Sequence, residues 1–492
     1  MGWRGMLDGF EADTPARGRS HTKVVATIGP ASEGRIGDLL DAGMSVARIN
    51  FSHGTHEDHR RRVERIRSEA KDRSSAVAIL ADLNGPKMRL GTFPNGTLDL
   101  AEGQRYRVVE GSGPAAEGQI PFDFSGFMDA VEAGHRAFLA DGGVEMVFES
   151  VQGGLSAVVT RAGTIGDRKG VHLPDTPLEL EVPTERDLED LELCQELGVD
   201  LIGVSFVARE EELQRVRELA PEAYIVAKIE RKPALANIHA LLREADGIMV
   251  ARGDLGVEMP AERLPLIQKS LIHEALRTGR FVITATEMLE SMVTSSRPTR
   301  AEVADVANAV FDGTDALMLS AETAVGRHPV EAVRMMGRIA VAVETSRRYQ
   351  DMPKEGFRTS EPDFSNATAL AAVRAAEALG IRRIACFTET GNTVRQLTRY
   401  HPAAEVTAFT PNPATRRKLA VLAHVRALEF ARVATLEEML DGACRVLLDL
   451  GLAEVDEELV FVAGVPLGVS RSTNMMKVHR IGQSVQLDGG AR

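Results

Sequence analysis

Short apolar, β-branched segments alternate with segments of helical period, and this alternation limits the possible folds more than any other feature of the chain. Strands that are apolar along their whole length are buried on both faces, which is typical of parallel sheets covered by helices. Eight strand–helix units can close into a (β/α)8 barrel. The expected strands are residues 23–28, 45–50, 77–82, 201–206, 224–229, 247–251, 281–286 and 316–320, with helices such as 57–71, 184–197 and 330–348 between them.

Two interruptions of the alternation predict additional domains. Residues 91–174 are rich in Gly and in Val/Phe runs without helical period, which indicates a small β domain inserted after the third strand. After a polar stretch at 351–362, a second alternation of helices and strands begins. A chain of 492 residues is long enough for about three domains. We therefore expect an α/β protein with a barrel at 21–90 and 175–349, an inserted β domain at 91–174, an α/β domain at 363–492 and a disordered extension at 1–20.

The charge balance and the cysteines exclude several classes of function. Lys and Arg number 58 against 71 Asp and Glu, so the net charge of −13 argues against a nucleic-acid partner. No run approaches the roughly 18 apolar residues of a membrane helix, and we expect no membrane partner. Cys194, Cys386 and Cys444 lie far apart without a CxxC pair, which is typical of reduced, buried thiols. These features predict a cytoplasmic protein.

Polar residues follow most of the expected strands, and in a barrel these positions converge on the C-terminal mouth. Residues two apart on a strand point to the same side, so Lys228 and Glu230 project together. Glu230 and Asp254, from adjacent strands, could hold Mg²⁺ with substrate oxygens and waters. Arg48 and Lys228 suit a phosphoryl group. Free N–H groups of a short helix at Gly253 and Asp254 could hold an anion. The mouth therefore predicts metal-assisted phosphoryl transfer.

Each of these motifs has a simpler interpretation. Lys228 and Glu230 could form a surface ion pair, and Arg48 could extend along the barrel rim to solvent. The joint pattern favours a ligand site, because burying so many charges at one mouth is costly without ligands. His53, His56 and His59, spaced three apart, could form a metal-binding face, but they drift around a helix, so a solvated helix start is favoured.

Eight segments of the chain resemble the signature segments of pyruvate kinase. The resemblance runs in order from about residue 23 to 338 and continues more loosely to the C-terminus. The segments are TKVVATIGPAS at 22–32, VARINFSHGTH at 46–56, DLNGPKMR at 82–89, AKIE at 227–230, GIMVARGDLGVE at 247–258, TATEMLESM at 284–292, RPTRAEVAD at 297–305 and DALMLSAETA at 315–324.

The resemblance implies a TIM barrel interrupted by a small β-barrel lid domain and followed by an α/β regulatory domain. It implies phosphoryl transfer from phosphoenolpyruvate to ADP with Mg²⁺ or Mn²⁺, in a homotetramer. Lys228 would stabilise the phosphoryl group, and Arg48 would bind phosphate. The metal ligands would be Glu230 and Asp254, with Gly253 also binding substrate. Thr286 would act in protonating enolpyruvate. Asp141, His53 and Arg89 would lie on the nucleotide and lid side.

The sequence departs from the family pattern at the positions for the monovalent cation. Asn50, Ser52 and Asp82 match this site, and Leu83 stands at another of its positions. Leu83 and Asn84 replace the usual Thr-Lys, and Lys87 replaces a usual Glu. This set resembles the K⁺-independent branch, because the ammonium of Lys87 could supply the charge otherwise given by K⁺. We expect that K⁺ is not required.

A loop in the C-terminal region resembles the family's loop for an effector phosphate. It contains Thr388, Thr390, Gly391, Asn392 and Thr393, with Ser470, Arg471 and Ser472 as further candidates. The carboxylate of Glu389 would repel a phosphate, so we expect fructose 1,6-bisphosphate to be weak or inactive, while a sugar monophosphate or AMP stays open. An ordinary helix cap is an equal alternative for this loop.

Two alternative functions stay open at this point. The Glu230 and Asp254 pair would also serve a Mg²⁺-dependent oxoacid lyase or aldolase, although Lys228 and the inserted domain argue against that class. A non-catalytic regulatory homologue is disfavoured, because a silent site has no reason to keep buried charges.

Overall fold

Eight parallel strands form a closed barrel in the computed structural model, which describes residues 20–140, 142–152, 154–178, 180–352, 363–466 and 473–483. The strands follow one another around the barrel in sequence order, and the last pairs with the first. Their bounds are β1 Lys23–Thr27, β2 Met44–Asn50, β3 Ala78–Asp82, β13 Leu201–Val204, β14 Tyr224–Ile229, β15 Gly247–Ala251, β16 Phe281–Ala285 and β17 Ala316–Leu319. The expected (β/α)8 barrel is confirmed.

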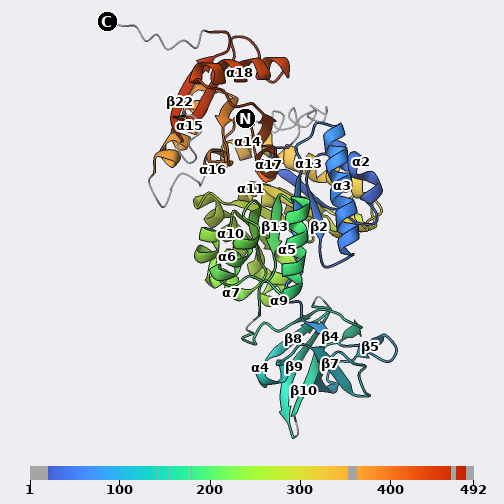
Figure 1. Cartoon of the computed structure of the whole chain (residues 1–492). Coiled ribbons are helices and arrows are strands. Elements are labelled where there is room, and N and C mark those ends of the chain that lie inside the picture. Colours follow the sequence, from blue (N-terminus) through green and yellow to red (C-terminus); the bar gives the residue numbers. More distant parts are fainter. Residues whose placement is uncertain are drawn as a thin grey trace, which may run out of the picture.

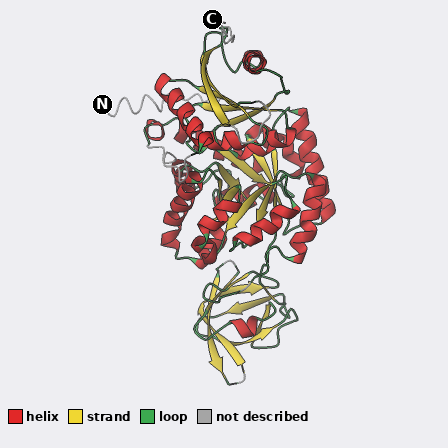
Figure 2. Cartoon of the chain, turned by 60° about the vertical axis from the view of Figure 1, so that its left-hand side comes forward, coloured by secondary structure: helices red, strands yellow, loops and turns green. Residues whose placement is uncertain are grey.

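Helices surround the barrel strands, as Figure 2 shows. Their starts are set by local chemistry: Thr55, Thr184 and Thr299 each form a capping box with the acidic residue three positions on. Gly198, at φ +57°, ends the helix that Thr184 begins. The longer helices are α2 Ile36–Ala42, α3 His56–Asp72, α5 Glu185–Leu197, α6 Glu210–Leu219, α8 Ile238–Glu244, α10 Leu264–Arg277, α11 Arg300–Asp312 and α13 Pro329–Glu344.

A β region is inserted between β3 and β13. Its main sheet has the order β12-β8-β9-β10-β6-β7-β4, and β11 pairs with β5. A bridge between Arg89 and Gly170 joins the two ends of the main sheet into a small barrel. The elements are β4 Arg89–Leu90, β5 Thr97–Leu100, β6 Arg105–Glu110, β7 Gln119–Asp123, α4 Phe127–Ala130, β8 Arg136–Leu139, β9 Val144–Val151, β10 Gly154–Arg161, β11 Gly163–Gly166 and β12 Val171–His172.

The C-terminal part is a five-stranded sheet in the order β20-β19-β18-β21-β22, parallel except for the edge strand β22. Its elements are α15 Phe364–Leu379, β18 Arg383–Phe387, α16 Asn392–Thr398, β19 Glu405–Thr410, α17 Pro413–Lys418, η5 Leu419–Val421, β20 Val425–Glu429, α18 Leu436–Asp449, β21 Glu458–Gly464 and β22 Thr473–Arg480. No helix in the described ranges is long and apolar enough to cross a membrane.

The inserted β region and the C-terminal part lie at opposite ends of the barrel (Figure 1). The apolar core inside the barrel continues into the C-terminal part: Val226 and Met249 belong to the same buried cluster as Val373, Val406 and Val460. The C-terminal part therefore covers the end of the barrel where the strands begin. The other end, where the strands finish, faces the inserted β region.

Two expected elements end at least two residues earlier than predicted. The strand expected at 201–206 stops at Val204, because Phe206 has a φ of +59° and turns the chain. The helix expected at 330–348 is divided into α13 and α14 Arg347–Gln350, since the Ser346 side chain accepts a hydrogen bond from Tyr349 N and starts a new helix.

Candidate active site

Three barrel strands, β2, β3 and β14, bring the predicted charged residues to the same end of the barrel, with β13 between β3 and β14. Asn50 pairs in register with Asp82, so β2 and β3 end together. Lys228 lies near the end of β14 and is followed two positions later by Glu230. All of these positions are at the carboxyl ends of parallel strands, where a barrel gathers its chemistry.

The Lys228 ammonium is the centre of a buried charge network. Its Nζ lies 3.0 Å from Asp82 Oδ1 and 2.8 Å from Glu230 Oε1, and it donates to Ser205 Oγ at 2.6 Å. The Arg48 guanidinium holds the other Asp82 oxygen at 2.6 Å. The side chains of Lys228 and Arg48 are each only 11% exposed, so the surface ion pair and the rim arginine are excluded.

The network shifts the pKa of Asp82 and the pKa of Lys228 in opposite directions. Burial alone would raise the pKa of Asp82, but Lys228 and Arg48 outweigh it and hold this pKa at about 2. Burial would lower the pKa of Lys228, but Asp82, Glu230 and Asp254 outweigh it and raise this pKa. Lys228 therefore stays charged and Asp82 stays ionised at neutral pH.

Glu230 and Asp254 are suited to a divalent cation. Glu230 is 2% exposed, and one of its oxygens accepts a hydrogen bond from Phe206 N at 2.7 Å. Burial raises the pKa of Glu230, and the charge of Asp254 raises it further. Asp254 lies in the first turn of α9 Arg252–Glu258, and its side chain is 32% exposed. The two negative charges repel each other, and one of the carboxylates is open to solvent. Such a pair suits a hard cation that retains waters.

Thr286 is held in a strained conformation at the end of β16. Its φ is +68°, which is unfavourable for a β-branched residue, and Glu287 follows at +53°. Thr286 Oγ1 accepts a hydrogen bond from Gly253 N at 2.7 Å and donates to Ala285 O at 2.6 Å. The Arg252 guanidinium donates to Thr286 O at 2.7 Å and pairs with Asp305. The Gly253 N–H expected to be free for an anion is therefore already engaged.

The predicted monovalent-cation positions form a connected group at the ends of β2 and β3. Ser52 Oγ donates to Asn84 Oδ1 at 2.7 Å, and Ser52 N donates to Asn50 Oδ1 at 3.1 Å. The carbonyl oxygen of Leu83 accepts from Ser205 Oγ at 2.7 Å. Lys87 is exposed and forms no salt bridge with another residue of the described ranges.

Residues on the side of the inserted region lie around the same mouth. Burial lowers the pKa of His53, and the charges of Lys87, Arg89 and Arg48 lower it further, so these groups are close together. The imidazole of His172, from β12, has its Nε2 4.0 Å from Asp254 Oδ1. Asp141, the predicted lid residue, lies outside the described residues.

The three spaced histidines do not form a metal-binding face. No group of three potential ligands was found among the described His, Cys, Asp and Glu side chains. His56 Nε2 lies 2.7 Å from Asp190 Oδ1. The expected solvated helix start is wrong for His59, which is 1% exposed and stacks on Phe51 with ring centroids 4.2 Å apart.

The predicted effector loop is built around short hydrogen bonds. Thr388 Oγ1 accepts from Gly391 N at 2.8 Å, and Thr393 Oγ1 lies 2.6 Å from Thr473 Oγ1. The Glu389 carboxylate forms a two-bond ion pair with Arg432, at 3.0 and 2.9 Å. The loop leads directly into α16, whose first residue is Asn392. The candidates Ser470, Arg471 and Ser472 lie outside the described residues.

Sequence reasoning missed several residues that shape the mouth. Ser205 links Lys228 to Leu83, but a lone Ser after a strand carries no signal. Glu322, just after the eighth barrel strand, is fully buried and accepts hydrogen bonds from Leu289 N and Ser320 N at 3.0 and 2.6 Å. The Ser320 hydroxyl is buried and has no hydrogen-bond partner among the described groups.

The closed barrel and its buried Arg, Lys and carboxylate cluster define an enzyme that handles phosphoryl groups at a barrel mouth. Two family models match the chain: "Pyruvate kinase, barrel domain" over residues 19–333 and "Pyruvate kinase, alpha/beta domain" over residues 366–479. The chain belongs to the pyruvate kinase family.

Several known proteins are similar over most of their length. A pyruvate kinase from Geobacillus stearothermophilus is 41% identical over 470 residues, which is 94% of this chain and 80% of that protein. A pyruvate kinase from Bacillus licheniformis is 39% identical over 474 residues, 94% of this chain and 81% of the other. A crystal structure of a pyruvate kinase from Cryptosporidium parvum superimposes with a TM-score of 0.86 at 32% identity, covering 96% of this chain and 98% of that one.

These relationships establish the reaction. The enzyme transfers a phosphoryl group from phosphoenolpyruvate to ADP, giving pyruvate and ATP, which is the last step of glycolysis. The family depends on a divalent metal ion.

Proposed function

We propose that Lys228 and Arg48 stabilise the phosphoryl group during its transfer to ADP. The observation that carries this proposal is the buried Lys228 ammonium, held 3.0 Å from Asp82 and 2.8 Å from Glu230 at the mouth of the barrel. A pre-positioned cation in a poorly hydrated site neutralises charge that moves between donor and acceptor, without reorganising at the moment of reaction. Asp82 positions both cations, because it contacts Lys228 with one oxygen and Arg48 with the other.

We propose Glu230 and Asp254 as the protein ligands of the divalent metal, with Mg²⁺ as its usual identity and Mn²⁺ as an accepted substitute. The support is one buried and one partly exposed carboxylate beside the phosphoryl-binding lysine. When bound, the metal neutralises phosphoryl and carboxylate oxygens. Gly253, directly before Asp254, brings the backbone close to the substrate and contacts Thr286.

Thr286 is the residue that we assign to the protonation of enolpyruvate. Its hydroxyl is fixed between Gly253 N and Ala285 O, on a backbone that Arg252 holds in place. A hydroxyl with a defined direction can pass a proton to a carbon on one face only. Rotating this hydroxyl toward the substrate requires giving up the hydrogen bond to Ala285 O.

The inserted region is proposed as a lid that closes over the nucleotide, with His53, Arg89 and Asp141 on its side of the mouth. Water in the site would divert the phosphoryl group toward hydrolysis, so closure favours transfer. Support comes from a contact at the edge of the mouth, where Lys232 Nζ donates to Pro174 O at 3.1 Å.

We propose that catalysis does not require K⁺. Lys87 would supply the positive charge near Asn50, Ser52, Asp82 and Leu83, and its influence on the neighbouring His53 supports a position close to this group. The cation positions are partly satisfied by protein groups, since Asn84 accepts from Ser52 and Leu83 O accepts from Ser205.

Further proposals concern the whole molecule. The division into a barrel at 21–90 and 175–349, a lid at 91–174 and a regulatory domain at 363–492 is supported by the separate apolar clusters of the inserted and C-terminal parts. The extension expected at 1–20 lies outside the described residues, apart from Ser20. A homotetramer follows from the family only by analogy.

The effector loop would take a sugar phosphate or AMP. Its candidate residues are Thr388, Thr390, Gly391, Asn392, Thr393 and Arg471. Three buried, unpaired cysteines support a reducing, cytoplasmic location.

One assay tests the residue roles and the cation proposal together. Pyruvate formation from phosphoenolpyruvate and ADP is measured with Mg²⁺, in tetramethylammonium buffer and in K⁺ buffer. Equal, fast rates support the K⁺-independent mechanism, whereas activity in K⁺ alone contradicts the role of Lys87. Omitting ADP separates the alternatives: a lyase or aldolase needs no nucleotide, and a non-catalytic homologue forms no pyruvate under any condition.

A further inference from the structure

The strand that carries Lys228 also reaches the C-terminal part at its other end. Tyr224 is the first residue of β14 and Lys228 is the fifth. Residues two apart on a strand point to the same side, so the side chains of Tyr224, Val226 and Lys228 form one column about 13 Å long. Tyr224 and Val226 belong to the buried cluster that fills the barrel and continues into the C-terminal part. One end of the column is therefore at the mouth, and the other end is at the junction with the C-terminal part.

The Tyr224 hydroxyl contacts the effector loop directly. Tyr224 is 5% exposed, and its Oη donates to Thr390 O at 3.2 Å. Burial raises the pKa of Tyr224, so the phenol stays protonated at neutral pH and remains a donor. Gly391 follows at φ +90°, and a Cβ at this position would lie 2.5 Å from the hydroxyl. The loop therefore lies so close to Tyr224 that only glycine fits at residue 391 without a shift.

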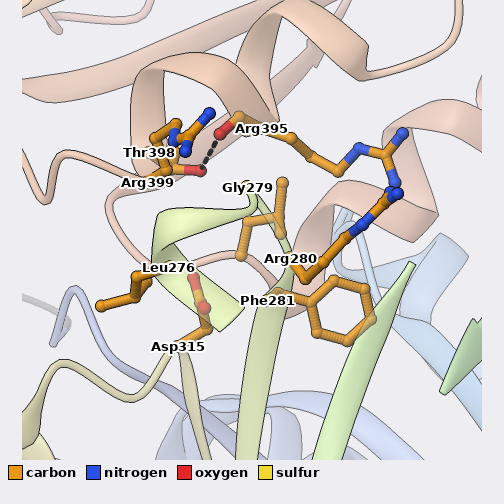
Figure 3. Close-up of a pocket in the computed structure, with 9 residues that line it drawn as sticks. Leu276, Gly279, Arg280, Phe281, Asp315, Arg395, Thr398 and Arg399 are labelled. Carbon is orange, nitrogen blue, oxygen red and sulfur yellow. Dashed lines mark hydrogen bonds between the residues drawn. The ribbon is translucent and has the colours of Figure 1, made fainter. Parts of the chain in front are cut away.

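The Tyr224 ring is held between two cations of the C-terminal part. Arg395 Cζ, from α16, lies 5.2 Å from the ring centroid, and Lys418 Nζ, from α17, lies 4.9 Å from it. Both distances are in the range of cation–π attraction. On the barrel side, the ring of Phe281 has its centroid 6.1 Å from that of Tyr224. Figure 3 shows Arg395 extending from α16 to lie next to Arg280, the residue before Phe281.

A second link joins α16 to the next residue of the strand. Arg395 pairs with Asp246 Oδ1 at 2.6 Å, and Asp246 Oδ2 accepts from Ile225 N at 3.0 Å. Arg217, from α6, holds the same Oδ2 at 2.7 Å. Burial would raise the pKa of Asp246, but Arg395 and Arg217 outweigh it and lower this pKa, so the carboxylate stays charged. The first two residues of β14 are therefore both fastened to the C-terminal part.

We propose that Tyr224 is a positioning residue that transmits the position of the effector loop to Lys228 through β14. A displacement of Thr390 or Gly391 changes the packing on the Tyr224 hydroxyl. The strand is paired on both sides, with β13 and β15, and all six of its residues are buried. Close-packed interiors transmit such a displacement. The inference rests on the proposed role of Lys228 in phosphoryl transfer.

The first test displaces the hydroxyl without any effector. Gly391→Ala places a methyl group against the Tyr224 hydroxyl, and we expect kcat/KM for phosphoenolpyruvate to fall at least fivefold. The matched control is Gly380→Ala, at the end of α15. This glycine also has a left-handed backbone, at φ +67°, but a Cβ there would meet no described atom within 4 Å. Gly380→Ala should change kcat/KM less than twofold.

Tyr224→Phe separates transmission from a general loss of stability. Phenylalanine keeps the ring between its two cations and removes only the hydroxyl. The double variant with Gly391→Ala and Tyr224→Phe should therefore recover kcat/KM to within twofold of Tyr224→Phe alone, although the side chain of Leu419 would still lie 3.1 Å from the new methyl group. An equal loss with and without the hydroxyl, or no loss in Gly391→Ala, overturns the proposal.

Hydrogen–deuterium exchange covers the case in which Gly391→Ala does not fold. Coupling between two sites is reciprocal, so phosphoenolpyruvate with Mg²⁺, bound at the mouth, should slow exchange in the loop 388–393 of the wild-type enzyme. Tyr224→Phe should remove this protection and keep the protection of residues 228–230. An unprotected loop in the wild type, or equal protection in both proteins, overturns the proposal. Normal turnover in Lys228→Met would instead remove the proposed function of Lys228 and leave the exchange result unchanged.

Discussion

The Lys228 ammonium and the Glu230 carboxylate lie 2.8 Å apart at the end of β14, so a phosphoryl-binding cation and a metal ligand share one rigid support. Replacing Lys228 by Met removes the cation and leaves Asp82 with Arg48 as its partner. We expect turnover to fall about 10³-fold or more, because a pre-positioned charge at the transferring group is lost. Steady-state pyruvate formation measures the effect.

The control for this substitution is Lys71→Met, in an exposed lysine at the end of α3. Circular dichroism should show the same fold for both variants. A turnover of Lys228→Met within tenfold of the wild-type value would remove Lys228 from the mechanism.

Lys87→Glu should convert the enzyme into one that depends on K⁺. The substitution replaces a cation by an anion close to His53 and the ends of β2 and β3. In tetramethylammonium buffer we expect a loss of at least tenfold in kcat/KM, and addition of K⁺ should restore most of it. Lys87→Gln, which removes the charge without reversing it, should show a smaller dependence. If neither variant responds to K⁺, the charge of Lys87 has no role in the site.

Thr286→Val should impair proton transfer more than phosphoryl transfer. Valine keeps the branched shape at the strained position and removes the hydroxyl that Gly253 N and Ala285 O now fix. The exchange of pyruvate methyl protons with solvent isolates this step, and we expect it to slow about 10²-fold or more. Thr286→Ser retains the hydroxyl and serves as the control. Normal exchange in Thr286→Val would assign the proton to another group.

His59 should make the folded protein less stable as the pH falls. Burial lowers the pKa of His59 from 6.5 to about 4, so the unfolded chain takes up the proton first. The stability is complete above pH 6.5 and is lost between pH 6.5 and 4, by up to about 3 kcal/mol. Thermal unfolding at pH 7.5 and 5 should show a smaller difference for His59→Phe than for the exposed control His239→Gln. An identical pH dependence in both variants would contradict this assignment.

Glu389 should limit the response to doubly phosphorylated sugars. Its carboxylate occupies Arg432 through two hydrogen bonds, so a phosphate at this loop must compete for that guanidinium. We expect fructose 1,6-bisphosphate to activate the wild-type enzyme less than twofold, and Glu389→Lys to increase its binding. Arg432→Gln should not increase it. Several-fold activation of the wild type at micromolar concentration would refute the expectation.

Much of the fold could be predicted, because the barrel strands carry their own signal. All six residues of β14 are buried, and the run 224–229 was predicted with the same bounds. The capping box of Thr184 with Asp187 and the glycine at 198 are local signals that the structure reproduces. The ends of β13 and β16 were less predictable, since Phe206 and Thr286 adopt positive φ values that only tertiary contacts can enforce.

The site could be predicted where charged residues follow strands, and not where neutral groups complete it. The positions near the carboxyl ends of strands predicted that four charged side chains converge, and the structure brings them together: Lys228, Arg48, Asp82 and Glu230. The contact of Ser205 with Lys228 joins residues 23 positions apart, and the pairing of Arg252 with Asp305 joins residues 53 apart. Such contacts depend on loop conformations that no periodic pattern encodes. For His59 the prediction was wrong in the other direction. The polar sequence around it predicted a solvated helix start, but the His59 ring packs against Phe51.

The apolar interior of the barrel passes without a break into the C-terminal part, and this continuity has a consequence for how the chain could be shortened or recombined. A fragment that ends after the barrel would leave the starts of the barrel strands, including Tyr224 and Phe281, facing water. The catalytic barrel is therefore not an autonomous module. Any ancestral gene that encoded this barrel alone would have needed another element to cover the end where the strands begin. A C-terminal part transplanted from another protein must pack against the apolar residues at this end.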